Sequence, residues 1–290
     1  MQRKKLQADG PLLSRIVSGA WRWNLPVDDV ERLIHKSLDL GITTFDHADV
    51  YGDHQNEAIF GKVLQKDPAL RNRMELITKC GIKFPSANRP KSRVKHYDTS
   101  SEHIRWSVDN SLQVLHTDRI DLLLIHRPDP LLNPLEVADA FTTLKRTGKV
   151  LHFGVSNFTA SQFEMLQTYL DFPLVTNQLE ISLTNHDAMF DGSLDALMKR
   201  RTSPMAWSPL GGGNLVQDET NPLFAKSSDY QATPVQLALA WLLKHPSVIF
   251  PVIGTTRPER IETCAKAVEI DIDLQDWFEM LKIVQGKEVP

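Results

Sequence analysis

Short apolar runs alternate with longer amphipathic stretches along almost the whole chain. The apolar runs have the length and composition of strands, and the stretches between them repeat apolar residues three and four positions apart, as on one face of a helix. In residues 27–40, for example, Val30, Leu33, Ile34 and Leu38 share one face, and Gly41 ends the helix. This alternation favours a parallel sheet with crossover helices.

Eight strands and eight helices are predicted from the pattern. The strands are expected at residues 16–20, 42–46, 74–79, 120–125, 150–155, 174–177, 204–207 and 248–253. The helices are expected at residues 27–40, 56–65, 98–115, 133–147, 160–169, 194–200, 234–244 and 258–268. Eight such units are typical of an α/β fold, the (β/α)8 TIM barrel. No linker divides residues 1–290, so we expect a single domain with an extra C-terminal helix at 274–283.

Length and composition are those of a globular protein without a nucleic-acid partner. The chain has 290 residues, 41% of them hydrophobic, and a net charge of −3. Cys80 and Cys264 are too few for a disulfide framework and lack metal-ligand spacing, so no metal is expected. Neither a signal peptide nor a long apolar run is evident. We therefore expect a cytoplasmic protein with no membrane partner, as a monomer or weak homo-oligomer.

Residues 81–97 interrupt the alternation. They contain two prolines and a group of basic residues, and they are longer than an ordinary connection between a strand and a helix. The segment is either a flap that covers a functional site or a solvated surface loop.

Ionisable residues gather where three successive predicted strands end. Asp46 ends the second strand, Lys79 ends the third, and His126 follows the fourth; Tyr51 lies in the loop after Asp46. Alone, each is more often a paired charge or a core histidine. Four of them at the barrel mouth, where barrel enzymes carry out chemistry, favour an acid–base site.

These residues belong to a series of motifs that runs through the chain. The motifs are D-x-A-x-x-Y-G from Asp46, T-K ending at Lys79, L-L-L-I-H ending at His126, G-V-S-N-F, N-Q-L-E, W-S-P-L-G-G-G and I-G-T-T-R-P-E-R. Together they resemble the aldo-keto reductase superfamily, in particular its bacterial branch with the His-Arg-Pro-Asp-Pro and Trp-Ser-Pro-Leu-Gly-Gly-Gly motifs. The resemblance also implies an N-terminal hairpin, at the turn signal Asp9-Gly10, that closes the bottom of the barrel.

The resemblance implies an NADPH-dependent oxidoreductase that reduces aldehydes or ketones to alcohols, with a small-molecule carbonyl substrate. Tyr51 would donate the proton, Lys79 paired to Asp46 would lower the pKa of Tyr51, and His126 would orient the carbonyl. Two alternatives stay open: a non-catalytic nicotinamide-binding protein that senses redox state, and an alcohol dehydrogenase that prefers NAD.

The cofactor would lie across the same mouth. No G-x-G-x-x-G motif follows a strand, so a Rossmann domain is not supported. By resemblance, Ser156, Asn157 and Gln178 would bind the nicotinamide carboxamide, and Trp207 would stack on the ring. The other expected cofactor-binding residues are Gly19, Trp21, Ser208, Pro209, Leu210, Gly211, Gly212, Gly254, Thr255, Arg257 and Arg260.

Two groups within that set are expected to bind phosphate. The glycine loop that begins at Ser208 would hold the pyrophosphate through backbone N–H groups. Thr255 and Arg260, with Arg257 assisting, would bind the 2′-phosphate of NADPH at a helix N-terminus. Thr263-Cys264 stand where the family often has Glu-Asn to hold adenine, so the adenine contact is left open.

The substrate pocket is expected near the first strand. Trp21 and Trp23 follow that strand and are predicted to line the pocket. Arg127, next to His126, either meets an acidic substrate or pairs with Asp129.

Overall fold

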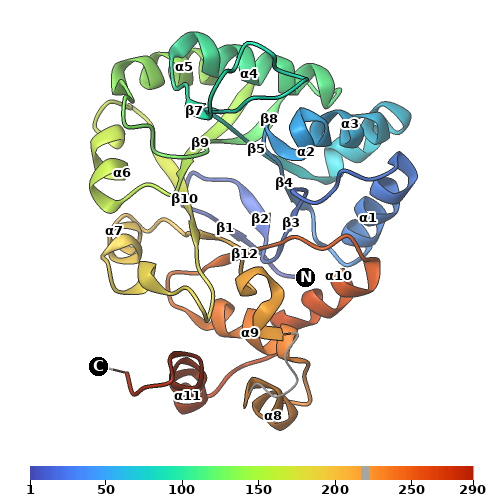
Figure 1. Ribbon diagram of the computed structural model, residues 1–290, viewed down its shortest axis with the longest axis vertical. Coiled ribbons are helices and arrows are strands. Elements are labelled where there is room, and N and C mark those ends of the chain that lie inside the picture. The colour runs from blue at the N-terminus through green and yellow to red at the C-terminus, as the bar shows by residue number, and fades with distance from the viewer. Residues whose placement is uncertain (217–221, 290) are drawn as a thin grey trace.

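A computed structural model of the protein describes residues 1–216 and 222–289, in which eight parallel strands close into a barrel (Figure 1). In chain order the strands are β3 (Val17–Gly19), β4 (Thr44–Asp46), β5 (Glu75–Cys80), β8 (Ile120–Ile125), β9 (Val150–Ser156), β10 (Leu174–Glu180), β11 (Met205–Trp207) and β12 (Phe250–Ile253). Each strand pairs with the next one along the chain, and β12 closes the ring against β3. The predicted TIM barrel is confirmed.

Helices follow the strands and surround the barrel (Figure 1). They are α1 (Val27–Asp39), α3 (Asn56–Lys66), α4 (Ser101–Val114), α5 (Pro134–Arg146), α6 (Ala160–Gln167), α7 (Ser193–Lys199), α9 (Pro234–Lys244) and α10 (Pro258–Ala265). In α1 the apolar face predicted from the sequence is buried against the barrel. In α9, Thr233 and Gln236 form a capping box, which satisfies N–H groups at the start of the helix.

An N-terminal hairpin closes one end of the barrel. Strands β1 (Arg3–Lys5) and β2 (Leu12–Ser14) pair antiparallel. Leu6 and Leu13 are buried in the cluster that fills the barrel interior, together with Ile77 and Leu122. The predicted hairpin is confirmed, and it leaves the opposite mouth, at the carboxyl ends of the strands, free for chemistry.

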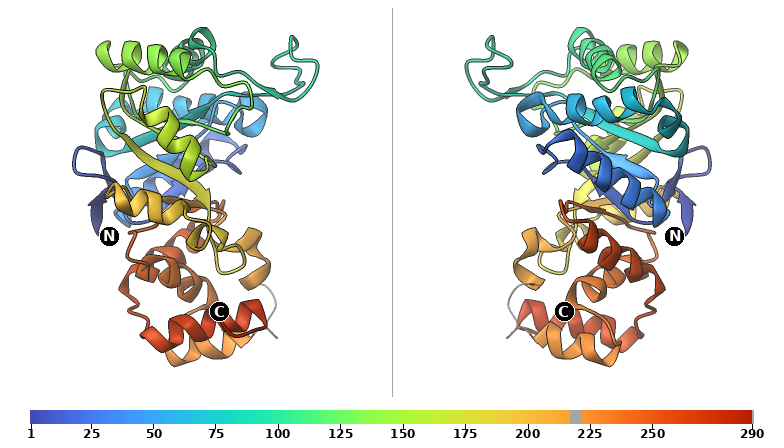
Figure 2. Two further views of the ribbon diagram at one scale, coloured as in Figure 1. Left: turned by 90° about the vertical axis from the view of Figure 1, so that its left-hand side faces the viewer. Right: turned by 90° about the vertical axis from the view of Figure 1, so that its right-hand side faces the viewer.

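The C-terminal helix α11 (Leu274–Gln285) packs on the outside of the barrel, as predicted. Trp277 stacks on Trp241 of α9 at 4.5 Å between ring centroids, and each indole N–H donates to the carbonyl oxygen of the other residue at 3.0 Å. A further helix, α8 (Pro222–Asp229), was not predicted; Lys226 joins it to Asp276 of α11. Figure 2 shows α8, α9 and α11 gathered at one end of the molecule.

The segment 81–97 is an extended loop with an ordered base. Strands β6 (Ile82–Lys83) and β7 (His96–Tyr97) pair antiparallel at this base, and the segment projects from the barrel in Figure 2. The remaining short elements are α2 (Tyr51–His54) and the 3-10 helices at Pro68–Arg73, Asp187–Met189, Gly211–Val216 and Lys266–Glu269. Within the described ranges, no helix is both long and apolar enough to span a bilayer.

Candidate active site

The polar strand-end residues lie on the inner side of the barrel because of strand periodicity. Side chains alternate between the two faces of a strand. Phe45 belongs to the cluster between barrel and helices, so Asp46 turns inward; likewise Ile77 fills the interior and Lys79 follows it on the same face. Alternation therefore brings side chains from separate strands to one mouth.

Lys79 is the centre of the candidate site. Its ammonium nitrogen lies 2.6 Å from Oδ2 of Asp46, 3.1 Å from the hydroxyl oxygen of Tyr51 and 2.8 Å from the carbonyl oxygen of His47. Asp46 and Lys79 are both almost fully buried. Burial alone would lower the pKa of Lys79, but Asp46 and Tyr51 more than offset this and raise it, so the ammonium is charged at neutral pH.

Lys79 lowers the pKa of Tyr51, as expected, but this effect does not bring the phenol pKa toward neutrality. Burial raises the pKa of the phenol by more than the charge of Lys79 lowers it, so the net pKa lies above its ordinary value of 10.0. The tyrosine therefore carries its proton at neutral pH. Because the ammonium donates to the phenol oxygen, the phenol hydrogen is free to point elsewhere.

His126 stands edge-on to Tyr51, with 5.8 Å between ring centroids and an interplanar angle of 78°. Burial, with the nearby charge of Lys79, lowers its pKa well below the ordinary value. The imidazole is therefore neutral at pH 7, with one nitrogen that donates and one that accepts. Its Nδ1 is buried without a partner among the described residues.

The residues expected to bind nicotinamide form a connected network. Trp207 Nε1 donates to Oδ1 of Asn157 at 2.8 Å, and Asn157 Nδ2 donates to Oγ of Ser156 at 2.8 Å. Ser156 Oγ donates to the carbonyl oxygen of Gln178 at 2.9 Å, and Gln178 Nε2 donates to Oδ1 of Asp46 at 2.9 Å. The network thus reaches the ion pair, which the sequence did not indicate.

The glycine loop is held by its own hydrogen bonds. The N–H groups of Gly211, Gly212 and Gly213 donate to Ser208 O, Ser208 Oγ and Leu210 O, respectively. The sequence predicted that backbone N–H groups of this loop bind the pyrophosphate, but in the structure these three N–H groups already have partners within the loop. A side chain at Gly211 would meet Thr184 Oγ1 at 2.3 Å, so this glycine has a packing reason as well. Pro209 is buried and Leu210 packs on the core, whereas a Cβ at Gly212 would meet open space.

The segment after β12 carries two exposed arginines at the start of α10. Arg257 is the N-cap residue, and neither it nor Arg260 makes an ion pair within the described ranges. Thr255 Oγ1 accepts from the N–H of Arg257 at 3.1 Å, and a Cβ at Gly254 would meet nothing within 4 Å. Two exposed arginine side chains without an ion-pair partner among the described residues therefore lie at the start of α10. Cys264 is buried, so it does not face that space.

The prediction that Trp23 lines a substrate pocket is wrong. Its side chain is 1% exposed, stacks on Phe60 and meets Phe45 edge-on, and its indole N–H donates to the carbonyl oxygen of Thr255 at 3.0 Å. Trp21 is 59% exposed. Gly19 also has a packing role, because a Cβ there would lie 2.9 Å from Val252 Cγ1.

Arg127 adds a cation that the sequence left unassigned. Its guanidinium lies over the ring of Trp207, 5.2 Å from the centroid. Asp129 instead accepts hydrogen bonds from Thr99 Oγ1 and Leu131 N. The mouth therefore holds two cations: Lys79, which is paired with Asp46, and Arg127, which lies over Trp207.

Comparisons with known proteins identify the family to which the chain belongs. The model of the aldo/keto reductase family matches residues 15–285. The chain is 46% identical to a 6-dehydroglucose reductase of Agrobacterium fabrum and 44% identical to the oxidoreductase YdhF of Escherichia coli, each over 100% of both chains.

A solved structure supports the fold. The crystal structure of the thermostable aldo-keto reductase Tm1743 with the inhibitor epalrestat superposes with a TM-score of 0.85 at 24% identity, and the match covers 98% of this chain and 100% of that one. The barrel, the full-length relatives and the family match lead to one conclusion: the chain belongs to the aldo/keto reductase family of oxidoreductases, whose members bind nicotinamide cofactors.

Proposed function

We propose that the protein is an NADPH-dependent reductase of aldehydes or ketones, working as a single barrel domain with Tyr51 as the proton donor. The observation that carries the proposal is the contact of Lys79 with both Asp46 and Tyr51, at 2.6 and 3.1 Å, inside the barrel mouth. A buried ion pair contributes little net stability compared with apolar packing. The Lys79–Asp46 ion pair lies against the phenol of Tyr51, where the ammonium can stabilise the phenolate left after Tyr51 donates its proton as a general acid.

The protonation states of Tyr51, Lys79 and His126 indicate how the proton is transferred. Tyr51 is protonated at neutral pH, and its hydrogen is not used by Lys79. When a carbonyl is reduced, its oxygen becomes strongly basic and takes this proton. The phenolate that remains lies beside the Lys79 ammonium, which stabilises it in a site shielded from water. His126, neutral and perpendicular to Tyr51, is suited to donate a hydrogen bond that orients the carbonyl oxygen.

The chain fits a nicotinamide cofactor through several of its features. When bound, the cofactor supplies the hydride to the carbonyl carbon. Asn157 and Gln178 carry amides that can exchange their present partners for a carboxamide, and Trp207 offers a flat face. Because the glycine N–H groups already have partners, the positive charge of Arg127 would attract the phosphates, and the open space at Gly212 would leave room for them.

Preference for NADPH over NADH rests on the arginines at α10. Arg257 and Arg260 are exposed, and within the described part of the chain no carboxylate neutralises them. A 2′-phosphate would add a dianion next to a helix N-terminus, where anions are favoured. This argues against the NAD-preferring alternative, and the four ionisable groups argue against a non-catalytic sensor.

The test is loss of absorbance at the reduced-nicotinamide band when a panel of aldehydes and sugar carbonyls is offered with NADPH or with NADH. A sugar carbonyl belongs in the panel because two relatives are named as 6-dehydroglucose reductases. We expect turnover with NADPH and a lower kcat/KM with NADH. Tight NADPH binding without turnover of any carbonyl would favour the sensor, and higher kcat/KM with NADH would favour the dehydrogenase.

A further inference from the structure

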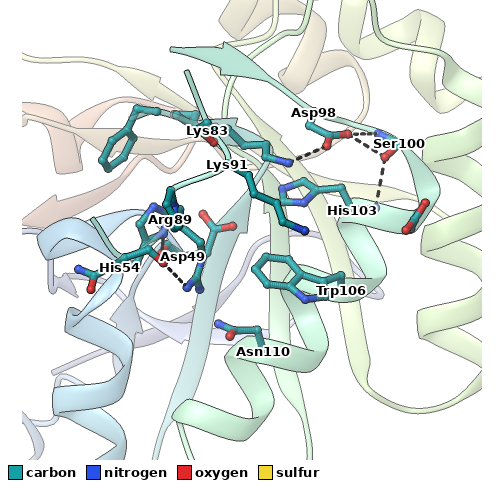
Figure 3. Close-up of a pocket in the computed structure, with 16 residues that line it drawn as sticks. Asp49, His54, Lys83, Arg89, Lys91, Asp98, Ser100, His103, Trp106 and Asn110 are labelled. Carbon is teal, nitrogen blue, oxygen red and sulfur yellow. Dashed lines mark hydrogen bonds and ion pairs between the residues drawn. The ribbon is translucent and has the colours of Figure 1, made fainter. Parts of the chain in front are cut away.

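A cavity of about 560 Å³ lies beside the barrel mouth, between the loop after β5 and helix α4 (Figure 3). Its lining includes Asp49 and His54, which flank Tyr51 in the sequence, but neither Tyr51, Lys79 nor His126. Small-molecule sites in proteins commonly have volumes of roughly 300–1,000 Å³. The cavity is therefore large enough for a metabolite and is separate from the site proposed for carbonyl reduction.

Two cations on the loop side of this cavity have no carboxylate partner within the described ranges. Arg89 lies over the ring of Trp106 at 5.2 Å and donates to the carbonyl oxygen of its neighbour Asn88. Lys91 makes no hydrogen bond or ion pair with any described residue. By contrast, Lys83 is paired with Asp98 at 3.0 Å. The loop therefore brings two cations without an ion-pair partner among the described residues to the cavity, which is also lined by the carboxylate of Glu102 on α4.

Polar atoms that the protein leaves unpaired lie on two facing walls of the cavity. Asp49 Oδ1, His54 Nε2 and His103 Nε2 are buried and have no partner among the described residues. Figure 3 shows Asp49 and His54 on one wall, and His103 and Trp106 on α4 facing them. Buried polar groups are nearly always hydrogen-bonded, so three unpaired atoms around one cavity are unusual.

These unpaired groups are uncharged at neutral pH. Burial raises the pKa of Asp49 to about 8 and lowers that of His103 to about 4. His54 Nδ1 contacts the carbonyl oxygen of Asp49 at 2.7 Å, so Nδ1 carries the hydrogen and Nε2 is an acceptor. All three atoms are shielded from solvent in the structure. Hydroxyl groups, which both donate and accept, satisfy such atoms best.

Stacked rings supply flat walls for the body of a ligand. His103 stacks on Trp106 at 5.6 Å with an interplanar angle of 22°, and His54 stacks on Phe84 at 5.1 Å and 21°. Flat aromatic faces present apolar area with few degrees of freedom, which suits a small ring. The cavity thus combines cations, neutral polar atoms and flat apolar surface.

We propose that this cavity binds a small hydroxyl-bearing organic anion, such as a sugar phosphate or a sugar acid. Arg89 and Lys91 hold the anionic group, and the hydroxyls pair with Asp49, His54 and His103. An anion without hydroxyls would leave the acceptor of His54 unpaired. An amine would find one carboxylate without an ion-pair partner in the described part of the chain, Glu102, against the two cations Arg89 and Lys91. The proposal does not depend on the proposed reductase activity.

The test is calorimetric titration of the full chain with D-glucose 6-phosphate, D-gluconate and uncharged D-glucose. We expect one of the two anions to bind at least about tenfold more tightly than D-glucose, as charge-assisted hydrogen bonds require. Arg89→Met should weaken that binding at least about tenfold. Arg93→Met is the matched control, since Arg93 is exposed on the same loop and does not line the cavity. Trp106→Leu, at a 47% exposed position, should also weaken binding.

Three results would overturn the proposal. Neither anion binds more tightly than D-glucose; or Arg89→Met and Arg93→Met have the same effect; or Arg260→Ala removes the binding while Arg89→Met leaves it intact. The third result would mean that the anion occupies the proposed 2′-phosphate site at the start of α10. None of them bears on whether the protein reduces carbonyls.

Discussion

The side-chain amide of Gln178 donates a hydrogen bond to Oδ1 of Asp46 at 2.9 Å, across the mouth from β10 to β4. The other oxygen of Asp46 accepts from Lys79. One buried carboxylate therefore joins a residue of the expected nicotinamide site to the cation beside Tyr51. Because both oxygens are used, the loss of either partner leaves a buried acceptor short of a hydrogen bond.

Lys79→Met tests this connection, because it removes the ammonium and keeps the length of the side chain. We expect carbonyl reduction to fall at least about 100-fold and its pH profile to change, as when a group that stabilises the conjugate base of a general acid is lost. Breaking a buried pair should also lower the free energy of unfolding by about 3–5 kcal/mol.

The control is Lys149→Met, which breaks an exposed ion pair with Asp109 and should cost about 0–1 kcal/mol. Urea unfolding gives the stabilities, and steady-state rates across pH give the profile. A Lys79→Met protein with full activity and an unchanged pH profile would show that Lys79 does not act on the proton donor.

Arg260→Ala tests the choice of cofactor. A charge-assisted hydrogen bond contributes about 1.5–3 kcal/mol, so NADPH binding should weaken at least about tenfold while NADH binding stays nearly constant. The salt dependence of NADPH binding should also flatten. Dissociation constants come from quenching of tryptophan fluorescence, with Arg146→Ala, an exposed arginine at the end of α5, as the control. Equal losses for NADH and NADPH would mean that Arg260 does not contact a 2′-phosphate.

Trp21 and Trp23 should differ sharply in their effect on stability. Trp23→Ala empties a site between Phe45 and Phe60, and the loss of a buried aromatic costs about 3–5 kcal/mol. Trp21→Ala removes an exposed ring and should change the free energy of unfolding by no more than about 0.5 kcal/mol. Thermal or urea unfolding of the two variants measures this difference. Similar losses in the free energy of unfolding would contradict the burial assigned to Trp23.

Asp49 makes stability depend on pH. Its folded pKa of about 8 lies above the ordinary 3.8, so the folded state holds a proton that the unfolded state has released. The contribution to stability is complete below about pH 4 and is lost as pH rises toward 8, by up to roughly 1.4 kcal/mol per pH unit. Asp49→Asn should flatten this slope, and Asp171→Asn, at an exposed carboxylate, should not. Urea unfolding at pH 5 and pH 8 measures both; an unchanged slope in Asp49→Asn would contradict the raised pKa.

The barrel could be predicted because its signals are local. Alternation of strand and helix patterns located all eight strands to within a few residues, and strand-end positions put Asp46, Lys79 and Ser156 on the inner face. Helix α8 was not predicted because its contact with α11 joins residues far apart in the sequence. Lys226 of α8 pairs with Asp276, 50 residues further on. Local periodicity carries no sign of such a partner.

Two kinds of site property were harder to predict: the direction in which a side chain points, and a pKa that results from opposing effects. Trp21 and Trp23 lie two residues apart, yet one is exposed and the other is buried, because Phe60 of α3 receives Trp23. The pKa of Tyr51 is a balance between burial and the charge of Lys79, and the sequence names the charge but not the burial. The cavity beside the mouth depends on where the 81–97 loop lies, which no motif encodes.

Tyr51→Phe tests the central claim most directly, because it removes one hydroxyl and keeps the ring against His126. The measurement is the single-turnover rate of carbonyl reduction with saturating NADPH, alongside the dissociation constant for NADPH. We predict a fall in rate of roughly 10²–10⁴-fold, the range typical of a lost general acid, with cofactor affinity nearly unchanged. A variant that reduces the same carbonyl at close to the original rate would contradict Tyr51 as the proton donor.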